Sequence, residues 1–231
     1  MKVDTLHFKC LIIGTAGSGK TYFAGSFPSP AFVFDFDQAA AGYRDSPGFS
    51  GETYKPVAGD WIKFESTARK VLDDPSIKTL IIDSATTMRE CAMERAMGIN
   101  PQRSPTGGPI GIAVQSHYSL AKNLMSNMFN RLLAADKNLV VIAHLVMEKD
   151  ELTNLVTAIP VFIGQSKASM PTLFTEVYYA TVQKVKGKRE YLLTTANNGI
   201  YAAKSVLSGR KNRLPEQVPN NYAAIMSYLK E

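Results

Sequence analysis

The sequence predicts an α/β fold: a mostly parallel, doubly wound sheet with an antiparallel hairpin near the C-terminus. Short apolar runs alternate with segments of helical spacing along the chain, as in sheets built from strand–helix–strand units. A glycine-rich phosphate-binding pattern follows the first apolar run directly. Polar residues stand at the ends of the central strands, where sheets of this kind place their ligands.

The chain of 231 residues is long enough for one sizeable core, and its hydrophobic content of 45% is that of an ordinary globular protein. We therefore expect a single domain over residues 1–231, with the basic hairpin and tail at 184–231 belonging to it. No apolar run approaches the roughly 20 residues needed to cross a bilayer. The N-terminus also lacks a signal-peptide pattern. These features predict a cytoplasmic protein without a membrane partner.

The apolar runs predict strands that match buried parallel strands in length and composition. The predicted strands are residues 8–13, 31–37, 78–84 and 139–144, followed by a hairpin of 176–185 and 190–195. The predicted helices are residues 21–26, 61–72 with Asp60 as N-cap, 86–97, 112–135 and 222–230. Residues 39–59, 98–111 and 145–164 are predicted to be largely irregular, and 166–174 is left undecided between loop and helix. Cys10 and Cys91 have no spacing partners, so both are interpreted as small buried side chains.

The phosphate-binding pattern is G-x-x-x-x-G-K-T without a mismatch. It consists of Gly14, Thr15, Ala16, Gly17, Ser18, Gly19, Lys20 and Thr21. Its glycines allow the backbone to wrap closely around phosphate oxygens, and the start of the next helix adds a partial positive charge. We expect Lys20 to reach the β- and γ-phosphates of ATP and the Thr21 hydroxyl to bind Mg²⁺.

Acidic residues and a histidine end the other predicted strands. Asp83 closes a buried strand, as a Walker B aspartate does, and is expected to hold Mg²⁺ against Thr21. Asp37 is the candidate base that polarises the attacking water, with Asp35 as its competitor or both in structural roles. His144 is interpreted either as a sensor of the γ-phosphate or as a structural residue.

The net charge of +6 is unevenly distributed. Residues 184–213 contain eight basic residues against Glu190 alone, while the remainder of the chain contains 18 basic and 19 acidic residues. Such a cluster is typical of a surface that meets an anion, either a nucleic acid or the nucleotide of a neighbouring subunit. The alternative is a hairpin whose charges simply face solvent.

The order of these motifs resembles the RecA-type ATPase core. The resemblance rests on the P-loop, the acid-ending second strand, Leu-Ile-Ile-Asp-Ser at 80–84, the glycine-rich loop, the long helix and Val-Val-Ile-Ala-His at 140–144. It covers about residues 8–215. The short length, Glu-Lys-Asp at 148–150 and Ser-Gly-Arg at 208–210 make the chain similar to the short phage single-strand-annealing recombinases, which are Sak-type and RecA/RadA-like.

The resemblance implies roles for several residues. The family usually has a glutamate where Asp37 stands, one methylene longer, which implies slow hydrolysis here, and a glutamine where His144 stands. It implies DNA binding by the loops 98–111 and 145–164, each with a single cation, so the basic 184–213 cluster is expected to contribute too. Lys204, Arg210, Lys211 and Arg213 are the candidate basic fingers for a neighbour's γ-phosphate. Tyr43 is the candidate for stacking on adenine.

The sequence therefore predicts a Mg²⁺-ATP-dependent, DNA-dependent ATPase that assembles with nucleotide at subunit interfaces on single-stranded DNA. Its expected partners are single-stranded DNA, further copies of the chain and a single-strand-binding protein, in the cytoplasm of a bacterial host. Two alternatives stay open: a P-loop kinase for a small molecule or nucleotide, and a nucleotide-gated loader with negligible turnover.

Overall fold

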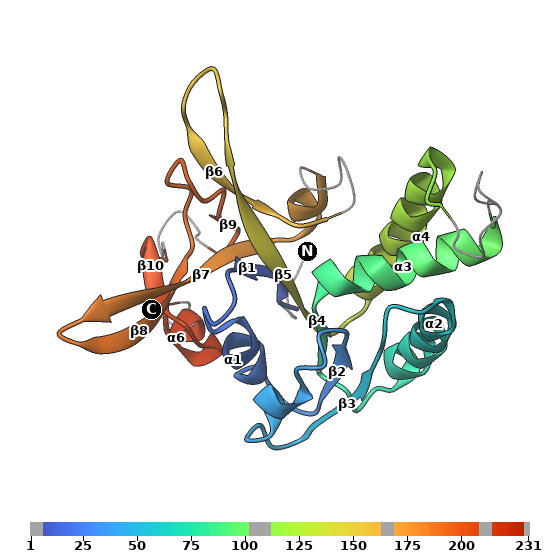
Figure 1. Cartoon of the computed structure of the whole chain (residues 1–231). Helices are drawn as coiled ribbons and strands as arrows, with labels where there is room; N and C mark the ends of the chain where they lie inside the picture. The colour runs from blue at the N-terminus through green and yellow to red at the C-terminus, as the bar shows by residue number, and fades with distance from the viewer. Residues whose placement is uncertain (1–6, 102–111, 163–168, 208–213, 229–231) are drawn as a thin grey trace, which may run out of the picture.

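The structure is a computed structural model that describes residues 7–101, 112–162, 169–207 and 214–228 (Figure 1). Within these residues one mixed sheet has the strand order β10-β8-β7-β1-β5-β4-β2-β3. Six of these strands are mutually parallel: β1 (Lys9–Gly14), β2 (Ala31–Asp35), β3 (Phe49–Thr53), β4 (Thr79–Asp83), β5 (Asn138–Lys149) and β7 (Glu176–Val185). The predicted fold class, a mostly parallel α/β sheet, is confirmed.

Helices cover both faces of the sheet because successive strand residues point to opposite sides. Leu11 and Ile13 of β1 belong to a core shared with α2 (Ala58–Asp73), α3 (Ala85–Ile99) and α4 (Gln115–Ala134). Cys10 and Ile12 belong to a second core, with α1 (Lys20–Gly25) and α6 (Tyr222–Ser227). Both cysteines are free and buried, as predicted. Among the described residues, no helix is long and apolar enough to cross a membrane.

The parallel pairing brings the predicted site residues to one edge of the sheet. In the register of β1 and β5, Gly14 lies opposite His144. In the register of β2 and β4, Asp35 lies opposite Asp83. The expectation that the strand ends share one site is thus met by the geometry.

The predicted C-terminal hairpin is present as β7 and β8 (Lys188–Thr194), joined through a turn in which Lys186 and Gly187 have positive φ. Two short strands, β9 (Lys204–Ser205) and β10 (Gln217–Pro219), pair with β7 and β8 respectively. The undecided segment at 166–174 contains the 3₁₀ turn η2 (Met170–Leu173).

Three local predictions are wrong. Residues 39–59 contain, besides the 3₁₀ turn η1 (Ala40–Tyr43), the edge strand β3, which pairs in parallel with β2. Residues 145–164 are not irregular throughout, because β5 continues to Lys149 and turns back as β6 (Val156–Pro160) in an antiparallel hairpin. Asp60 is not the N-cap of α2; it lies in the first turn, where its carboxylate accepts the Lys55 N–H at 2.6 Å.

The glycine-rich segment after α3 is held at its base by His117 of α4. The ring Nδ1 accepts the Val114 N–H at 3.0 Å, and Nε2 lies 2.6 Å from the Asn100 carbonyl oxygen. Since a carbonyl only accepts, Nε2 carries the ring proton. His117 therefore ties the chain before this segment to the chain after it, while residues 102–111 lie outside the described part.

Candidate active site

The P-loop connects β1 to α1 in a conformation that needs its glycines. Gly17 and Gly19 have φ values of 74° and 87°, which side chains with a Cβ rarely adopt. Lys20 is only 6% exposed, and its ammonium donates to the carbonyls of Gly14 at 2.9 Å and Thr15 at 2.7 Å. Burial lowers the pKa of Lys20, against the opposing charges of Asp83 and Asp37. Ser18 Oγ is buried without a hydrogen-bond partner in the described structure.

Thr21 and Asp83, the two predicted magnesium ligands, carry oxygen atoms of the kind that this ion prefers. Thr21 Oγ1 donates to Asp83 Oδ2 at 3.0 Å, so the two predicted ligands, 62 residues apart in sequence, are in direct contact. Burial raises the pKa of Asp83, although hydrogen bonds from Tyr43 and Thr21 oppose the shift. Mg²⁺ prefers such oxygen ligands and keeps several waters, so one hydroxyl and one carboxylate fit it in a phosphate site. No cluster of three or more His, Cys, Asp or Glu side chains suited to a metal occurs within the described ranges.

Asp37 lies just beyond β2 among three hydrogen-bond donors. Its Oδ1 accepts from Ser84 Oγ at 2.8 Å and from Thr87 Oγ1, and its Oδ2 lies 3.0 Å from His144 Nε2. Desolvation raises the pKa of Asp37, but the hydrogen bonds from His144, Thr87 and Ser84 outweigh it, and the net pKa is lowered. Asp37 is therefore a carboxylate at neutral pH, the form that can accept a proton from water.

His144 lies where the buried part of β5 ends and the exposed hairpin begins. Its backbone N–H donates to Thr86 Oγ1 at 2.9 Å, while Nε2 donates to the carboxylate of Asp37. The side chain is 36% exposed. The histidine thus pairs with the candidate base and is continuous with the β5–β6 hairpin.

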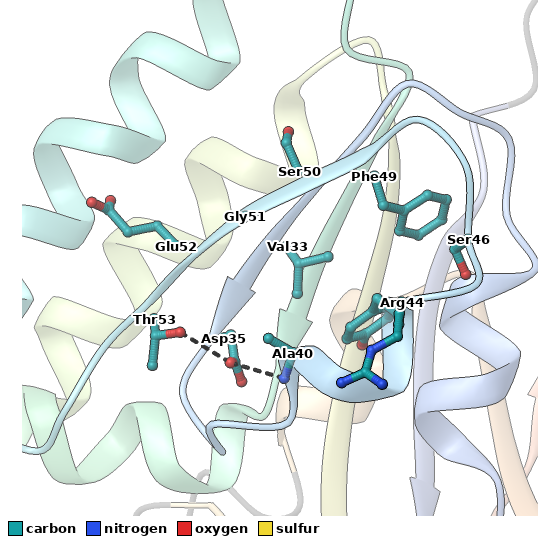
Figure 2. A pocket seen from close by; sticks show the side chains of 11 residues that line it. Val33, Asp35, Ala40, Arg44, Ser46, Phe49, Ser50, Gly51, Glu52 and Thr53 are labelled. Carbon is teal, nitrogen blue, oxygen red and sulfur yellow. Dashed lines mark hydrogen bonds between the residues drawn. The ribbon is translucent and has the colours of Figure 1, made fainter.

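Asp35, the competing acid, has a structural environment instead. It is 2% exposed, and its carboxylate accepts the N–H groups of Ala39 at 2.8 Å and Ala40 at 3.1 Å. Thr53 Oγ1 of β3 donates to it at 3.2 Å (Figure 2). These bonds secure η1 and the end of the edge strand at the wall of a cavity of about 290 Å³. Asp35 therefore anchors the loop η1, whereas Asp37 accepts hydrogen bonds from the side chains of Ser84, Thr87 and His144.

The expectation that Tyr43 stacks on adenine does not fit its position. The side chain is buried, its ring stacks on Phe49 at a centroid distance of 6.0 Å, and its hydroxyl donates to Asp83 Oδ2 at 2.7 Å. Tyr43 thus contacts the Asp83 carboxylate, and it also lines the cavity of about 290 Å³ beside η1.

A cavity of about 690 Å³ opens beside the P-loop, and the sequence did not indicate its far wall. One side consists of Gly17, Gly19, Lys20, Thr21 and Tyr22, and the other of Tyr191, Pro219, Asn220 and Asn221. Asn220 Nδ2 donates to the Gly19 carbonyl at 3.2 Å and the Ser18 carbonyl at 3.4 Å. The start of α6 is thereby attached to the P-loop. A Cβ on Gly19 would lie 3.0 Å from the Tyr191 ring, which shows how closely β8 approaches.

The predicted basic fingers are placed only in part. Arg210, Lys211 and Arg213 lie outside the described residues, as does Arg103 of the first predicted DNA loop. Lys204 forms part of β9, and its ammonium donates to the Thr172 carbonyl at 3.3 Å. Their roles at a neighbouring subunit stay predictions.

Comparison with known proteins places the chain in a family. The crystal structure of a KaiC-like protein from the hyperthermophilic archaeon Pyrococcus horikoshii OT3 matches 91% of this chain and 83% of its own, with 12% identity and a TM-score of 0.49. A likeness at that level carries no information on function. A search of curated proteins finds no match. The sequence pattern of the AAA domain family matches residues 7–207. Because that match spans most of the chain, the protein belongs to the AAA domain family, and its core is a nucleotide-binding P-loop ATPase.

Proposed function

We propose that the chain is a Mg²⁺-ATP-dependent ATPase that assembles on single-stranded DNA and promotes annealing or strand exchange in a bacterial host, as phage single-strand-annealing recombinases do. The observation that carries the proposal is the continuity of β8, which runs from the exposed cations Lys188 and Arg189 to Tyr191 at the P-loop cavity. A cationic surface and the nucleotide cavity thus share one strand. This arrangement supports coupling between an anionic polymer and the nucleotide.

The P-loop residues are suited to bind and orient a nucleoside triphosphate. Mg²⁺ held beside the P-loop would neutralise negative charge on the phosphates. Lys20 exchanges its two carbonyl acceptors for phosphate oxygens, while Thr21 and Asp83 hold the cation. Asp37 accepts a proton from the attacking water. Its three donors keep the carboxylate oriented and ionised for that task.

His144 is suited to couple this chemistry to the outside of the molecule. Its Nε2 proton has Asp37 as its acceptor, and a γ-phosphate oxygen would compete for the same proton. Since β5 continues from His144 to Lys149 without a break, a change of acceptor acts on the base of the exposed hairpin. This is the sensor role expected from the sequence.

The nucleoside is proposed to lie in the cavity beside the P-loop, with its base against Tyr191. Replacing Tyr191 with alanine should weaken nucleotide binding about 3- to 10-fold, the range typical of a lost aromatic contact. Tyr191→Phe, which keeps the ring, should bind as the wild type does. Titration calorimetry with a slowly hydrolysed ATP analogue measures both variants, and equal affinity of Tyr191→Ala and wild type would rule out this base site.

The DNA surface is proposed to be the basic hairpin β7–β8 rather than the β5–β6 hairpin, contrary to the role expected for residues 145–164. Lys184, Lys186, Lys188 and Arg189 are exposed on the β7–β8 hairpin, against Glu190 alone. The tip of the β5–β6 hairpin instead carries Glu148, Asp150 and Glu151 against Lys149. Phosphate affinity depends on cations, so the acidic tip is unsuited to a nucleic acid.

A triple variant tests the basic hairpin. Lys184→Ala, Lys188→Ala and Arg189→Ala together should weaken single-stranded DNA binding and lower the slope of log affinity against log salt by about 2, because each phosphate contact contributes about 0.7 for single strands. The matched control replaces three exposed helix cations, Arg69, Lys70 and Lys122, with alanine. Fluorescence anisotropy over a salt series measures both, and an equal slope for the two variants would contradict the assignment.

The β5–β6 hairpin supports the proposed assembly. It projects from the body of the molecule (Figure 1) and exposes an apolar set. The set is Val146, Met147, Leu152, Leu155 and Val156, with Leu152 at 95% exposure. Exposed apolar residues gathered on one projecting element are typical of contacts between proteins. Further copies of the chain or a single-strand-binding protein are the proposed partners.

A further inference from the structure

Tyr43 occupies a position at the metal carboxylate that nucleotide binding alone does not require. Its hydroxyl donates to Asp83 Oδ2 at 2.7 Å, and the same oxygen accepts from Thr21 Oγ1 at 3.0 Å. Tyr43 is 6% exposed and Asp83 2% exposed. A buried carboxylate needs donors to offset its lost hydration, and Tyr43 supplies one that comes from neither the P-loop nor β4.

The surroundings hold Tyr43 in this place. Its ring stacks on Phe49 of β3, with 19° between the ring planes. The preceding Gly42 packs so closely on the P-loop helix that a Cβ there would lie 2.7 Å from Thr21 Cγ2. At the other end of η1, the carboxylate of Asp35 accepts the Ala39 N–H. It also accepts the Ala40 N–H (Figure 2). η1 is therefore fixed at both ends, and the hydroxyl has a defined direction.

The two hydroxyls on Asp83 differ in what they can do for a cation. Thr21 can keep donating to Asp83 while a lone pair of its oxygen faces Mg²⁺. Tyr43 is buried, with its ring stacked on Phe49 and its hydroxyl proton directed at Asp83 Oδ2, so it acts on the carboxylate as a donor rather than on the cation as a ligand. Replacing a residue that hydrogen-bonds to a metal ligand typically lowers metal affinity by 10- to 100-fold.

We propose that Tyr43 is a positioning residue of the magnesium site, whose hydroxyl holds the Asp83 carboxylate in the orientation that binds the cation. This inference rests on the proposed function, because it requires that Thr21 and Asp83 bind Mg²⁺ with the nucleotide. In this proposal, η1 and the edge strand β3 hold Tyr43 in place, and Tyr43 in turn aligns the metal ligand.

The test separates Mg²⁺ binding from nucleotide binding. Tyr43→Phe removes the hydroxyl and retains the ring that stacks on Phe49. ADP binding is measured by calorimetry over a Mg²⁺ titration and again in EDTA. We expect the Mg²⁺ concentration for half-maximal effect to rise about 10-fold or more, while affinity for ADP in EDTA changes less than 2-fold.

The matched control is Tyr178→Phe, which removes another buried tyrosine hydroxyl that donates to a carboxylate, that of Glu176 on the same strand. It should lower thermal stability and leave the Mg²⁺ dependence unchanged. A second variant, Phe49→Leu, keeps the Tyr43 hydroxyl but removes the ring on which Tyr43 stacks. It should also raise the Mg²⁺ concentration for half-maximal effect, and it takes the place of Tyr43→Phe if that variant fails to fold.

The outcomes are distinct. The inference is overturned if Tyr43→Phe shows the same Mg²⁺ dependence as the wild type. The same holds for Phe49→Leu where that variant is used instead, and Tyr43 is then a residue of the packed core only. Equal losses in Tyr43→Phe and Tyr178→Phe overturn it too, because they indicate a general loss of stability. Wild-type ADP binding that is indifferent to Mg²⁺ contradicts the proposed function instead.

Discussion

Replacing Lys20 with alanine is expected to abolish nucleotide binding at concentrations that saturate the wild type. The ammonium is the one P-loop cation, and it is held inside the loop by the carbonyls of Gly14 and Thr15, at the position from which it reaches phosphate oxygens. Hydrogen bonds to charged groups contribute about 1.5–3 kcal/mol each. Losing two such bonds from the ammonium to phosphate oxygens therefore lowers nucleotide affinity by about 100-fold or more. Calorimetry with Mg²⁺ and a slowly hydrolysed ATP analogue measures the loss.

Two controls accompany this variant. Lys70→Ala removes an exposed cation of α2, far in sequence from the P-loop, and should bind nucleotide as the wild type does. Thermal denaturation of Lys20→Ala checks that the fold survives, because the variant also loses two internal hydrogen bonds. A folded Lys20→Ala protein with normal binding and turnover would refute the assignment of this site.

Replacing Asp37 with asparagine is expected to lower ATP turnover by about 10²- to 10⁴-fold, the usual contribution of a general base, while nucleotide affinity is retained. Asparagine has nearly the same shape as aspartate but cannot accept the proton of the attacking water. Its carbonyl oxygen can still accept from Ser84 or Thr87, so the local hydrogen bonds are largely kept. Single-turnover kinetics with saturating ATP measures the chemical step apart from binding.

Asp35→Asn is the matched comparison for Asp37→Asn. Asp35 accepts two backbone N–H groups and the Thr53 hydroxyl, so its replacement should mainly lower thermal stability. A fall in turnover for Asp35→Asn that exceeds the fall for Asp37→Asn would reverse the two roles. The comparison is informative because both aspartates lie at or just beyond the end of β2 and differ in their hydrogen-bond partners.

The sequence predicted the central sheet and the site at its edge because those features depend on local pattern. Continuous apolar runs mark β1, β4 and the first half of β5, which are buried on both faces. Parallel pairing then brings the ends of these strands together, so Thr21, Asp83, Asp37 and His144 could be assigned to one site from their positions alone.

Two of the wrong local predictions concern strands that lack such a pattern. β3 reads Phe-Ser-Gly-Glu-Thr, with half-exposed and exposed side chains, and it exists because its backbone pairs with β2. In the outer part of the β5–β6 hairpin the apolar residues Val146 and Met147 are exposed and are followed by Glu148 and Lys149, so no alternation of buried apolar and exposed polar residues marks the strand. Pairing between backbones, rather than burial of side chains, forms both elements.

The contacts that hold the site together could not be predicted from the sequence, because they join residues far apart in the chain. Tyr43 meets Asp83 across 40 residues, and Asn220 meets Gly19 across 201 residues. Neither contact belongs to a motif of fixed spacing. The sequence therefore carries no signal for the contact between Tyr43 and Asp83, and it does not single out Tyr191 or Asn220.

Steady-state ATP hydrolysis by the wild-type protein with Mg²⁺, measured as single-stranded DNA is titrated in, decides whether the chain is a DNA-dependent ATPase. We expect slow basal turnover that rises with DNA to a plateau, and we expect the variant with Lys184, Lys188 and Arg189 replaced to lose this rise. Turnover that is the same at every DNA concentration would contradict this expectation, and transfer of phosphate to a small acceptor would identify the chain as a kinase instead.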